Sequence, residues 1–96
     1  MNRRSPIRRL AVVNRGEAAM RCIRAVKALR ALEGEGLEVV AHFTESDREA
    51  PFVRHADLAL PLASPRGEVA AFLDHEVLLE VLSESEADAV WPGWGF

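Results

Sequence analysis

The feature that most constrains the fold is a short apolar run that leads through a tight turn into a long helical segment. Residues 10–13 read Leu-Ala-Val-Val and are followed by Asn14 and Gly16. A run of this length between turn signals is typical of a strand buried in a parallel sheet. Residues 17–33 are rich in Ala, Leu, Arg and Glu, which are good helix formers. We therefore expect a strand, a turn and a helix at the start of the domain.

The rest of the chain continues this alternation. The further predicted elements are strands at residues 37–43, 58–62 and 87–91, a helical turn at 52–56, and a helix after Asp74. The carboxylate of Asp74 can accept hydrogen bonds from the exposed N–H groups of a first helical turn. Alternating strands and helices require crossover connections and therefore a parallel sheet. The predicted fold class is α/β, a Rossmann-like parallel sheet flanked by helices, in a single domain over residues 1–96.

The long helix shows one apolar stripe, which should face the core. Its members recur at helical spacing and are Ala19, Cys22, Ile23, Val26 and Leu29. Cys22 is the single cysteine, so we expect a buried, inert thiol and no intrachain disulfide. A chain without disulfides suits a reducing cytoplasm.

Composition excludes several classes of partner. With 96 residues, 49% hydrophobic content and a formal net charge of -3, the chain should fold and has no broad attraction for nucleic acid or anionic membranes. No apolar run approaches the ~20 residues that a membrane helix needs. The basic residues Arg3, Arg4, Arg8 and Arg9 are interpreted as a solvated tail, and the acidic run of Glu84, Glu86 and Asp88 as a solvated helix end.

The turn after the first strand occupies the place of the G-x-G-x-x-G/A turn of dinucleotide-binding folds. Gly16 matches the second glycine and Ala19 the third position, whereas Asn14 replaces the first glycine. Glu17 also places a carboxylate where a pyrophosphate would bind, and two like charges there would repel. The pattern therefore favours a plain strand-to-helix turn over nucleotide binding.

The end of the chain, residues 91–96, places two glycines among aromatic side chains after the last predicted strand. Ligands of open α/β sheets bind at the carboxyl ends of strands. Two interpretations stay open, a rigid turn that caps the core and a loop that faces a ligand, and a longer chain would favour the second. No Ser, Cys or Lys stands in a nucleophile motif, and no His or Cys residues have metal-ligand spacing, so we predict neither a catalytic residue nor a metal site.

These segments together resemble the start of biotin carboxylases. Residues 10–17, with Ala19, Arg21, Ile23 and Arg24, are similar to that family's I-A-N-R-G-E-I-A-x-R-I-x-R segment. Residues 72–74 resemble its Y-L-N helix start, and residues 87–96 resemble its A-x-A-I-H-P-G-Y-G-F ending, with tryptophan in place of His and Tyr. The resemblance covers nearly the whole chain.

The resemblance implies a Rossmann-like domain that precedes an ATP-grasp module, so this chain is expected to be a fragment of a longer protein. The full enzyme would use MgATP and bicarbonate to carboxylate biotin. The implied partners are the downstream ATP-grasp domain, a biotin carrier domain or protein, and a second copy in a homo-oligomer. We expect no cofactor to bind to this fragment alone and no activity from it, since the family's catalytic residues lie downstream.

The resemblance also assigns places to particular residues. Arg21 and Arg24 fall where bacterial members make a dimer contact. The candidate loops of the active-site cleft floor are Asn14, Arg15, Gly16, Glu17, Gly93, Trp94, Gly95 and Phe96. Two alternatives remain: the equivalent domain of another ATP-grasp ligase, of the carbamoyl-phosphate or purine-pathway type, and a stand-alone nucleotide- or NAD-binding module.

Overall fold

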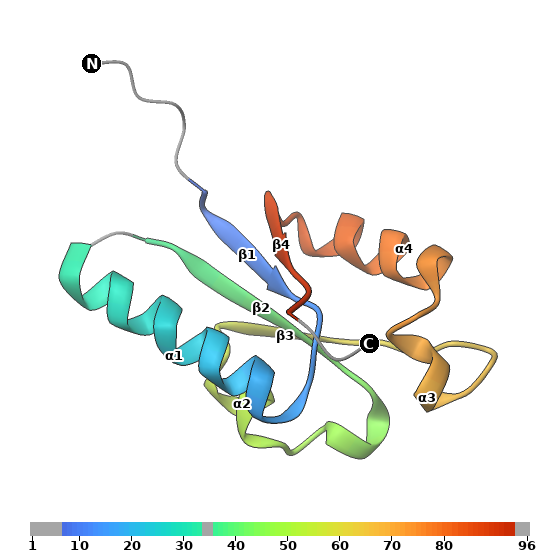
Figure 1. The fold of residues 1–96 in the computed structure, drawn as a ribbon. Coiled ribbons are helices and arrows are strands. Elements are labelled where there is room, and N and C mark those ends of the chain that lie inside the picture. Colours follow the sequence, from blue (N-terminus) through green and yellow to red (C-terminus); the bar gives the residue numbers. More distant parts are fainter. Residues whose placement is uncertain (1–6, 34–35, 94–96) are drawn as a thin grey trace.

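The computed structural model describes residues 7–33 and 36–93 (Figure 1). The elements run in the order β1 (Arg9–Val12), α1 (Gly16–Glu33), β2 (Glu38–Phe43), the 3-10 helix η1 (Glu45–Asp47), α2 (Pro51–His55), β3 (Leu58–Pro61), α3 (Glu68–Ala71), α4 (His75–Ser85) and β4 (Ala89–Trp91). The predicted alternation of strands and helices is confirmed, with element ends shifted by one or two residues at most positions.

The described strands form one parallel sheet in the order β3-β2-β1-β4. Leu10 of β1 lies between Val39 of β2 and Ala89 of β4, which fixes the register of the central strands. The predicted fold class is therefore confirmed. Because the chain first adds strands on one side of β1 and then returns to the other side, the strand order reverses between β1 and β4. In open α/β sheets, ligands bind at such a reversal of strand order.

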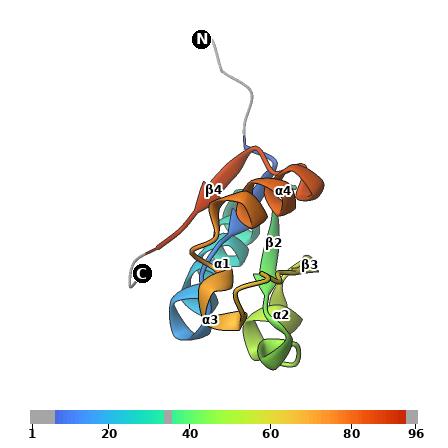
Figure 2. The same ribbon diagram turned by 90° about the vertical axis from the view of Figure 1, so that its right-hand side faces the viewer.

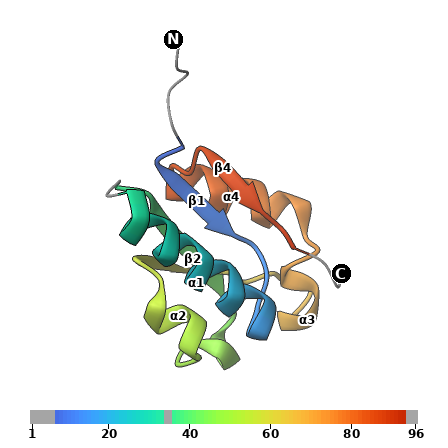
Figure 3. The same ribbon diagram turned by 60° about the vertical axis from the view of Figure 1, so that its left-hand side comes forward.

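Helices cover both faces of the sheet. Helices α1 and α2 lie together on one face, and α4 lies on the other, as Figures 1 and 3 show. Figure 2 looks onto the face that α4 covers, with α3 below α4 in that view. Val12, the last residue of β1, packs in the cluster beneath α1, and Val13, which follows it, packs in the cluster beneath α4. This alternation follows from the two-residue period of a strand.

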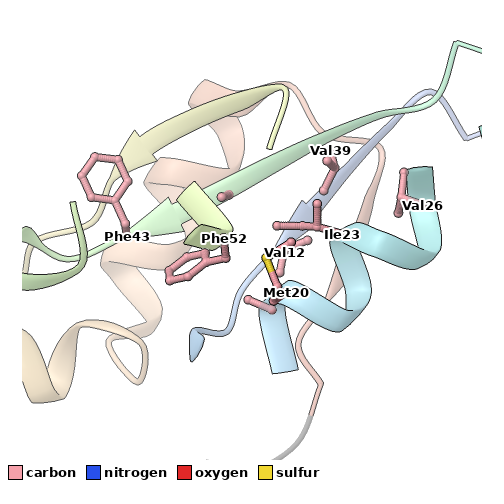
Figure 4. Close-up of a cluster of buried hydrophobic side chains, with 9 residues drawn as sticks. Val12, Met20, Ile23, Val26, Val39, Phe43 and Phe52 are labelled. Atoms are coloured by element: carbon pink, nitrogen blue, oxygen red, sulfur yellow. The ribbon is translucent and has the colours of Figure 1, made fainter. Parts of the chain in front are cut away.

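The larger core cluster lies between α1, α2 and the sheet (Figure 4). Ile23 of α1 is fully buried and lies against Val12 and Val39 in this cluster. The predicted stripe is thus confirmed for most of its length, with Cys22 only partly buried, but it was wrong for Leu29, which is 50% exposed. The cause is length: the helix spans 18 residues, about 27 Å, whereas β1 has four residues, about 13 Å. The last turns of α1 therefore extend past the strand.

The layer of α4 confirms one expectation and corrects another. Asp74 caps α4 as predicted, because its carboxylate accepts hydrogen bonds from the Val77 N–H at 3.3 Å and from the Ser64 hydroxyl at 2.7 Å. Behind the cap, Val81 is buried in the second core cluster. No helix was predicted between the strand expected at residues 58–62 and Asp74, but the four-residue helix α3 lies there. A helix of one turn is too short to show a period in the sequence.

Two charged residues that the sequence placed in solvent hold the start of β1. Arg9 is the first residue of β1, pairs with Glu38 at 2.8 Å and donates to the Ser85 carbonyl at 2.8 Å. The carboxylate of Asp88 accepts a hydrogen bond from the Arg9 backbone N–H at 2.8 Å and two longer ones from that of Arg8. Interpreting Arg9 as tail and Asp88 as a solvated helix end was therefore wrong. Their partners are up to 80 positions away, so sequence patterning contains no signal for them.

Candidate functional site at the carboxyl edge of the sheet

The loops that follow the strands meet at the carboxyl edge of the sheet. Residues 13–15 connect β1 to α1, Thr44 and η1 follow β2, and Pro92 and Gly93 follow β4. In open α/β sheets the crevice that holds a ligand opens where the strand order reverses, which here lies between β1 and β4. Two of the candidate loops predicted from the sequence therefore lie at this point of reversal.

Asn14 spans the point of reversal. Its side-chain amide is buried and donates to the Pro92 carbonyl at 2.9 Å, and its side-chain oxygen accepts from the Arg15 N–H at 2.7 Å. The Val13 N–H also donates to the Trp91 carbonyl at 3.0 Å, which extends the pairing of β1 with β4 beyond the strands. The two loops are thus joined by the chain's own contacts.

Gly93 makes the close approach between these loops feasible. Its φ is +70°, a left-handed conformation that residues with a side chain rarely adopt. A Cβ at this position would lie 2.7 Å from Nδ2 of Asn14 and 2.8 Å from Cη2 of Trp91. The glycine in this turn thus has a specific physical cause. The other candidates of the same loop, Trp94, Gly95 and Phe96, lie outside the described residues.

Arg15 connects the turn after β1 to the loop after β2. Its Nε and Nη2 donate to the two carboxylate oxygens of Asp47 at 2.6 and 2.9 Å. This hydrogen bonding is the main cause of a raised pKa of Arg15; burial lowers the pKa by less, and the charges of Asp47 and Glu68 raise it further by smaller amounts. Sequence reasoning predicted Arg15 as a site residue but not its partner. The only available signal was a carboxylate soon after the second predicted strand.

A second polar contact connects the loop after β2 to α3. The Ser46 hydroxyl donates to a carboxylate oxygen of Glu68, the first residue of α3, at 2.5 Å. Ser46 precedes Asp47 in the chain, so this contact adjoins the hydrogen bonds that run from Pro92 through Asn14 and Arg15 to Asp47. We name this set the carboxyl-edge network; its members are Asn14, Arg15, Ser46, Asp47, Glu68 and Pro92. Apart from Asn14 and Arg15, none of these residues was predicted as a site residue.

Glu17 lies in the first turn of α1 and is engaged by two arginines of the same helix. Its carboxylate lies 3.2 Å from Nε of Arg21 and 3.9 Å from Nη1 of Arg24. All three side chains are about two-thirds exposed. Gly16, before Glu17, has a φ of +63° and begins the helix. The role of Arg21 and Arg24 at a dimer contact stays a prediction.

The arrangement supports positioning of loops rather than chemistry by this domain. The Arg15 guanidinium is bound to Asp47, the Asn14 amide is bound to Pro92, and the Glu17 carboxylate would repel a phosphate at the start of α1. In the described ranges no three His, Cys, Asp or Glu side chains are placed to hold a metal ion. These residues therefore do not by themselves fit ATP, magnesium or biotin.

The three histidines differ in burial. His42 is fully buried, whereas His55 and His75 are exposed. Within the part of the chain that the structure describes, no helix has the length and apolar character needed to cross a membrane. Neither feature adds a reactive group to the carboxyl-edge network.

Comparison with known proteins gives the same family along the whole domain. Residues 6–96 match the family model described as "Biotin carboxylase, N-terminal domain". The chain is 40% identical over 92 residues to the biotin-dependent acyl-coenzyme A carboxylase alpha3 subunit of Mycobacterium leprae, and the match covers 96% of this chain but 14% of the relative. The chain thus spans about one seventh of that relative's length.

Solved structures agree in fold as well as in sequence. The biotin carboxylase domain of a single-chain bacterial carboxylase superimposes with a TM-score of 0.79 at 40% identity, over 93% of this chain and 19% of that one. The biotin carboxylase of Campylobacter jejuni, in a β-γ-ATP complex, gives a TM-score of 0.79 at 27% identity, over 95% of this chain and 19% of that one. The parallel sheet, the turn after β1 and the family match thus lead to one conclusion: the chain belongs to the biotin carboxylase N-terminal domain family.

Proposed function

We propose that this chain is the first domain of a longer biotin carboxylase and serves as the scaffold for a downstream ATP-grasp module. That module would use MgATP and bicarbonate to carboxylate biotin held on a carrier domain or carrier protein. The observation that carries the proposal is the family match over residues 6–96, in a chain that spans 14% of the relative. A single cysteine that forms no intrachain disulfide supports a cytoplasmic location for the protein.

The carboxyl edge would contribute the floor of the active-site cleft. The turn at Asn14–Glu17 and Gly93 after β4 lie at the reversal of strand order, where open α/β sheets bind ligands. Their polar groups are already engaged within the domain, so they would shape the floor while residues of the ATP-grasp module bind ATP, magnesium, bicarbonate and biotin. For this reason we expect the domain alone to be catalytically silent.

The first test is to sequence the coding DNA beyond the Phe96 codon and to assay the protein that it encodes. We expect a glycine-rich lid, paired metal-binding glutamates, and ATP hydrolysis that depends on both bicarbonate and biotin. ATP hydrolysis that ignores biotin but responds to a different acceptor would favour another ATP-grasp ligase. Calorimetric binding of NADH or ATP to the isolated domain would favour a stand-alone nucleotide-binding module.

A second copy of the protein would contact the exposed side of α1 at Arg21 and Arg24. Both arginines are about two-thirds exposed and lie one turn apart, beside Glu17. Arg21→Glu and Arg24→Glu in the full protein should lower the mass measured by sedimentation from dimer toward monomer. Arg54→Glu, at an exposed position on α2, is the matched control and should leave the mass unchanged. An unchanged mass in both α1 variants would place the contact elsewhere.

A further inference from the structure

We propose that Arg15 is a positioning residue of the cleft floor: through Asp47 it fixes the turn after β1 to the loop after β2. The floor would then meet the catalytic module as one rigid unit. This inference rests on the proposed function and goes beyond it, because it assigns the alignment of the floor to one ion pair. The pair joins two loops 32 positions apart in the sequence.

The geometry of the pair is suited to holding orientation. Two parallel hydrogen bonds, of 2.6 and 2.9 Å, join a planar guanidinium to a planar carboxylate, so they restrain rotation as well as distance. Asp47 is the more buried partner, with 15% of its side chain exposed against 53% for Arg15. The restraint thus acts from a mostly covered carboxylate onto a guanidinium at the surface.

The connections of the pair extend across the whole edge. On one side, the Arg15 N–H donates to the side chain of Asn14, which in turn donates to the Pro92 carbonyl after β4. On the other side, Ser46, next to Asp47, donates to Glu68 at the start of α3. Arg15 therefore lies in the middle of the carboxyl-edge network, where its loss would separate the two halves.

A second bidentate pair in the same region offers a matched control. Arg48 donates to the two carboxylate oxygens of Glu45 at 3.0 and 2.8 Å, and these residues are only three positions apart. Because both belong to one loop, this pair joins no separate elements. Exposed ion pairs of either kind contribute little to stability, so an effect on catalysis can be separated from an effect on folding.

The experiment uses the full-length protein and measures biotin-dependent ATP hydrolysis. Arg15→Lys keeps the positive charge but loses the two-point geometry, and Asp47→Asn removes the charge of the partner. We expect each to lower kcat about 10-fold, since small displacements of reacting groups are costly, while the KM for ATP changes by less than about twofold. The melting temperature of Arg15→Lys should stay within about 2 °C of the parent protein.

The controls decide between positioning and a general structural role. Arg48→Lys and Glu45→Gln should leave kcat unchanged. The inference is overturned if Arg15→Lys keeps the parent kcat, or if kcat falls equally in the control variants. If the parent protein shows biotin-dependent ATP hydrolysis and Arg15→Lys has the same kcat, this inference alone is refuted. A parent protein without biotin-dependent hydrolysis refutes the proposed function, and this inference with it.

Discussion

The two edges of the sheet are built in opposite ways. At the carboxyl edge, the carboxyl-edge network ties neighbouring loops together, and Gly93 passes so close to Asn14 that no side chain would fit between them. At the amino edge, a cavity of about 710 Å³ opens beside the start of β1, and its apolar lining includes Ile7, Leu29 and Leu37. Ile7 and Leu29 are about half exposed there.

Several charged groups at the amino-edge cavity, Arg30 among them, are bound by the chain itself. Arg30 donates to the Leu37 carbonyl and to Asp57, both at 2.7 Å, and Asp57 also accepts from the Val39 N–H at 2.8 Å. Burial would raise the pKa of Asp57, but its hydrogen bonds with Arg30 and Val39, together with the charges of Arg30 and Lys27, outweigh burial and lower the pKa. The comparison teaches that this cavity is not the better candidate site, because the converging loops and the reversal of strand order lie at the opposite edge.

The largest expected effect compares one glycine from each edge. Gly93→Ala should lower the free energy of unfolding by about 4 kcal/mol, because the added Cβ meets Asn14 and Trp91 and the left-handed φ is strained. Gly36→Ala, at the amino edge, meets nothing within 4 Å and should change stability by less than about 0.5 kcal/mol. Chemical denaturation of both variants is the measurement. Equal losses of stability in the two variants would contradict the proposed difference between the two edges.

The next largest effect is a dependence of the free energy of unfolding on pH, which compares the groups that titrate at the two edges. His42, near the carboxyl end of β2, is fully buried, and both ring nitrogens lack a hydrogen-bond partner among the described residues. Burial disfavours the charged ring and lowers its pKa from 6.5 to about 4. As the pH falls from 6.5 toward 4, the unfolded chain takes up a proton that the folded chain does not. The free energy of unfolding should therefore fall by about 3 kcal/mol over this range.

His42→Leu is the variant that isolates this effect, and His55→Gln, at an exposed histidine, is its control. Denaturation curves at several pH values should lose their dependence between pH 6.5 and 4 in His42→Leu and keep it in His55→Gln. The amino edge should respond at lower pH, where the carboxylate of Asp57, with its lowered pKa, takes up a proton. A slope that persists in His42→Leu would show that other groups control acid stability.

The smallest expected effect is a gain at the amino edge. Glu86 lines the cavity and ends α4 with a φ of 56°, the left-handed conformation that glycine adopts at many helix ends. Glu86→Gly should raise the free energy of unfolding by about 1 kcal/mol, since it relieves this strain. Thermal unfolding measures the gain. A loss of stability would mean that the Glu86 side chain contributes more than its backbone strain costs.

Local patterns in the sequence determined the elements and the fold class. The apolar run before Asn14, the stripe through Ile23 and the cap at Asp74 each depend on neighbours within a few positions, which is the range over which strand and helix periodicity acts. The same patterns supported the family, because the turn at Asn14–Glu17 and the ending at Gly93 are contiguous motifs. Arg15 and Gly93 were thus predicted as candidate site residues from the sequence.

Only the tertiary structure decided what those residues touch. Arg15 and its partner Asp47 are 32 positions apart, and Asn14 and its partner Pro92 are 78 positions apart. Asp88, which holds the start of β1, is up to 80 positions from its partners. Such pairs come together because parallel strands bring loops that are distant in the chain to the same edge of a sheet. No periodicity in the sequence predicts such long-range contacts. The sequence by itself therefore identified the domain, and the register of its strands decided how the carboxyl edge is held.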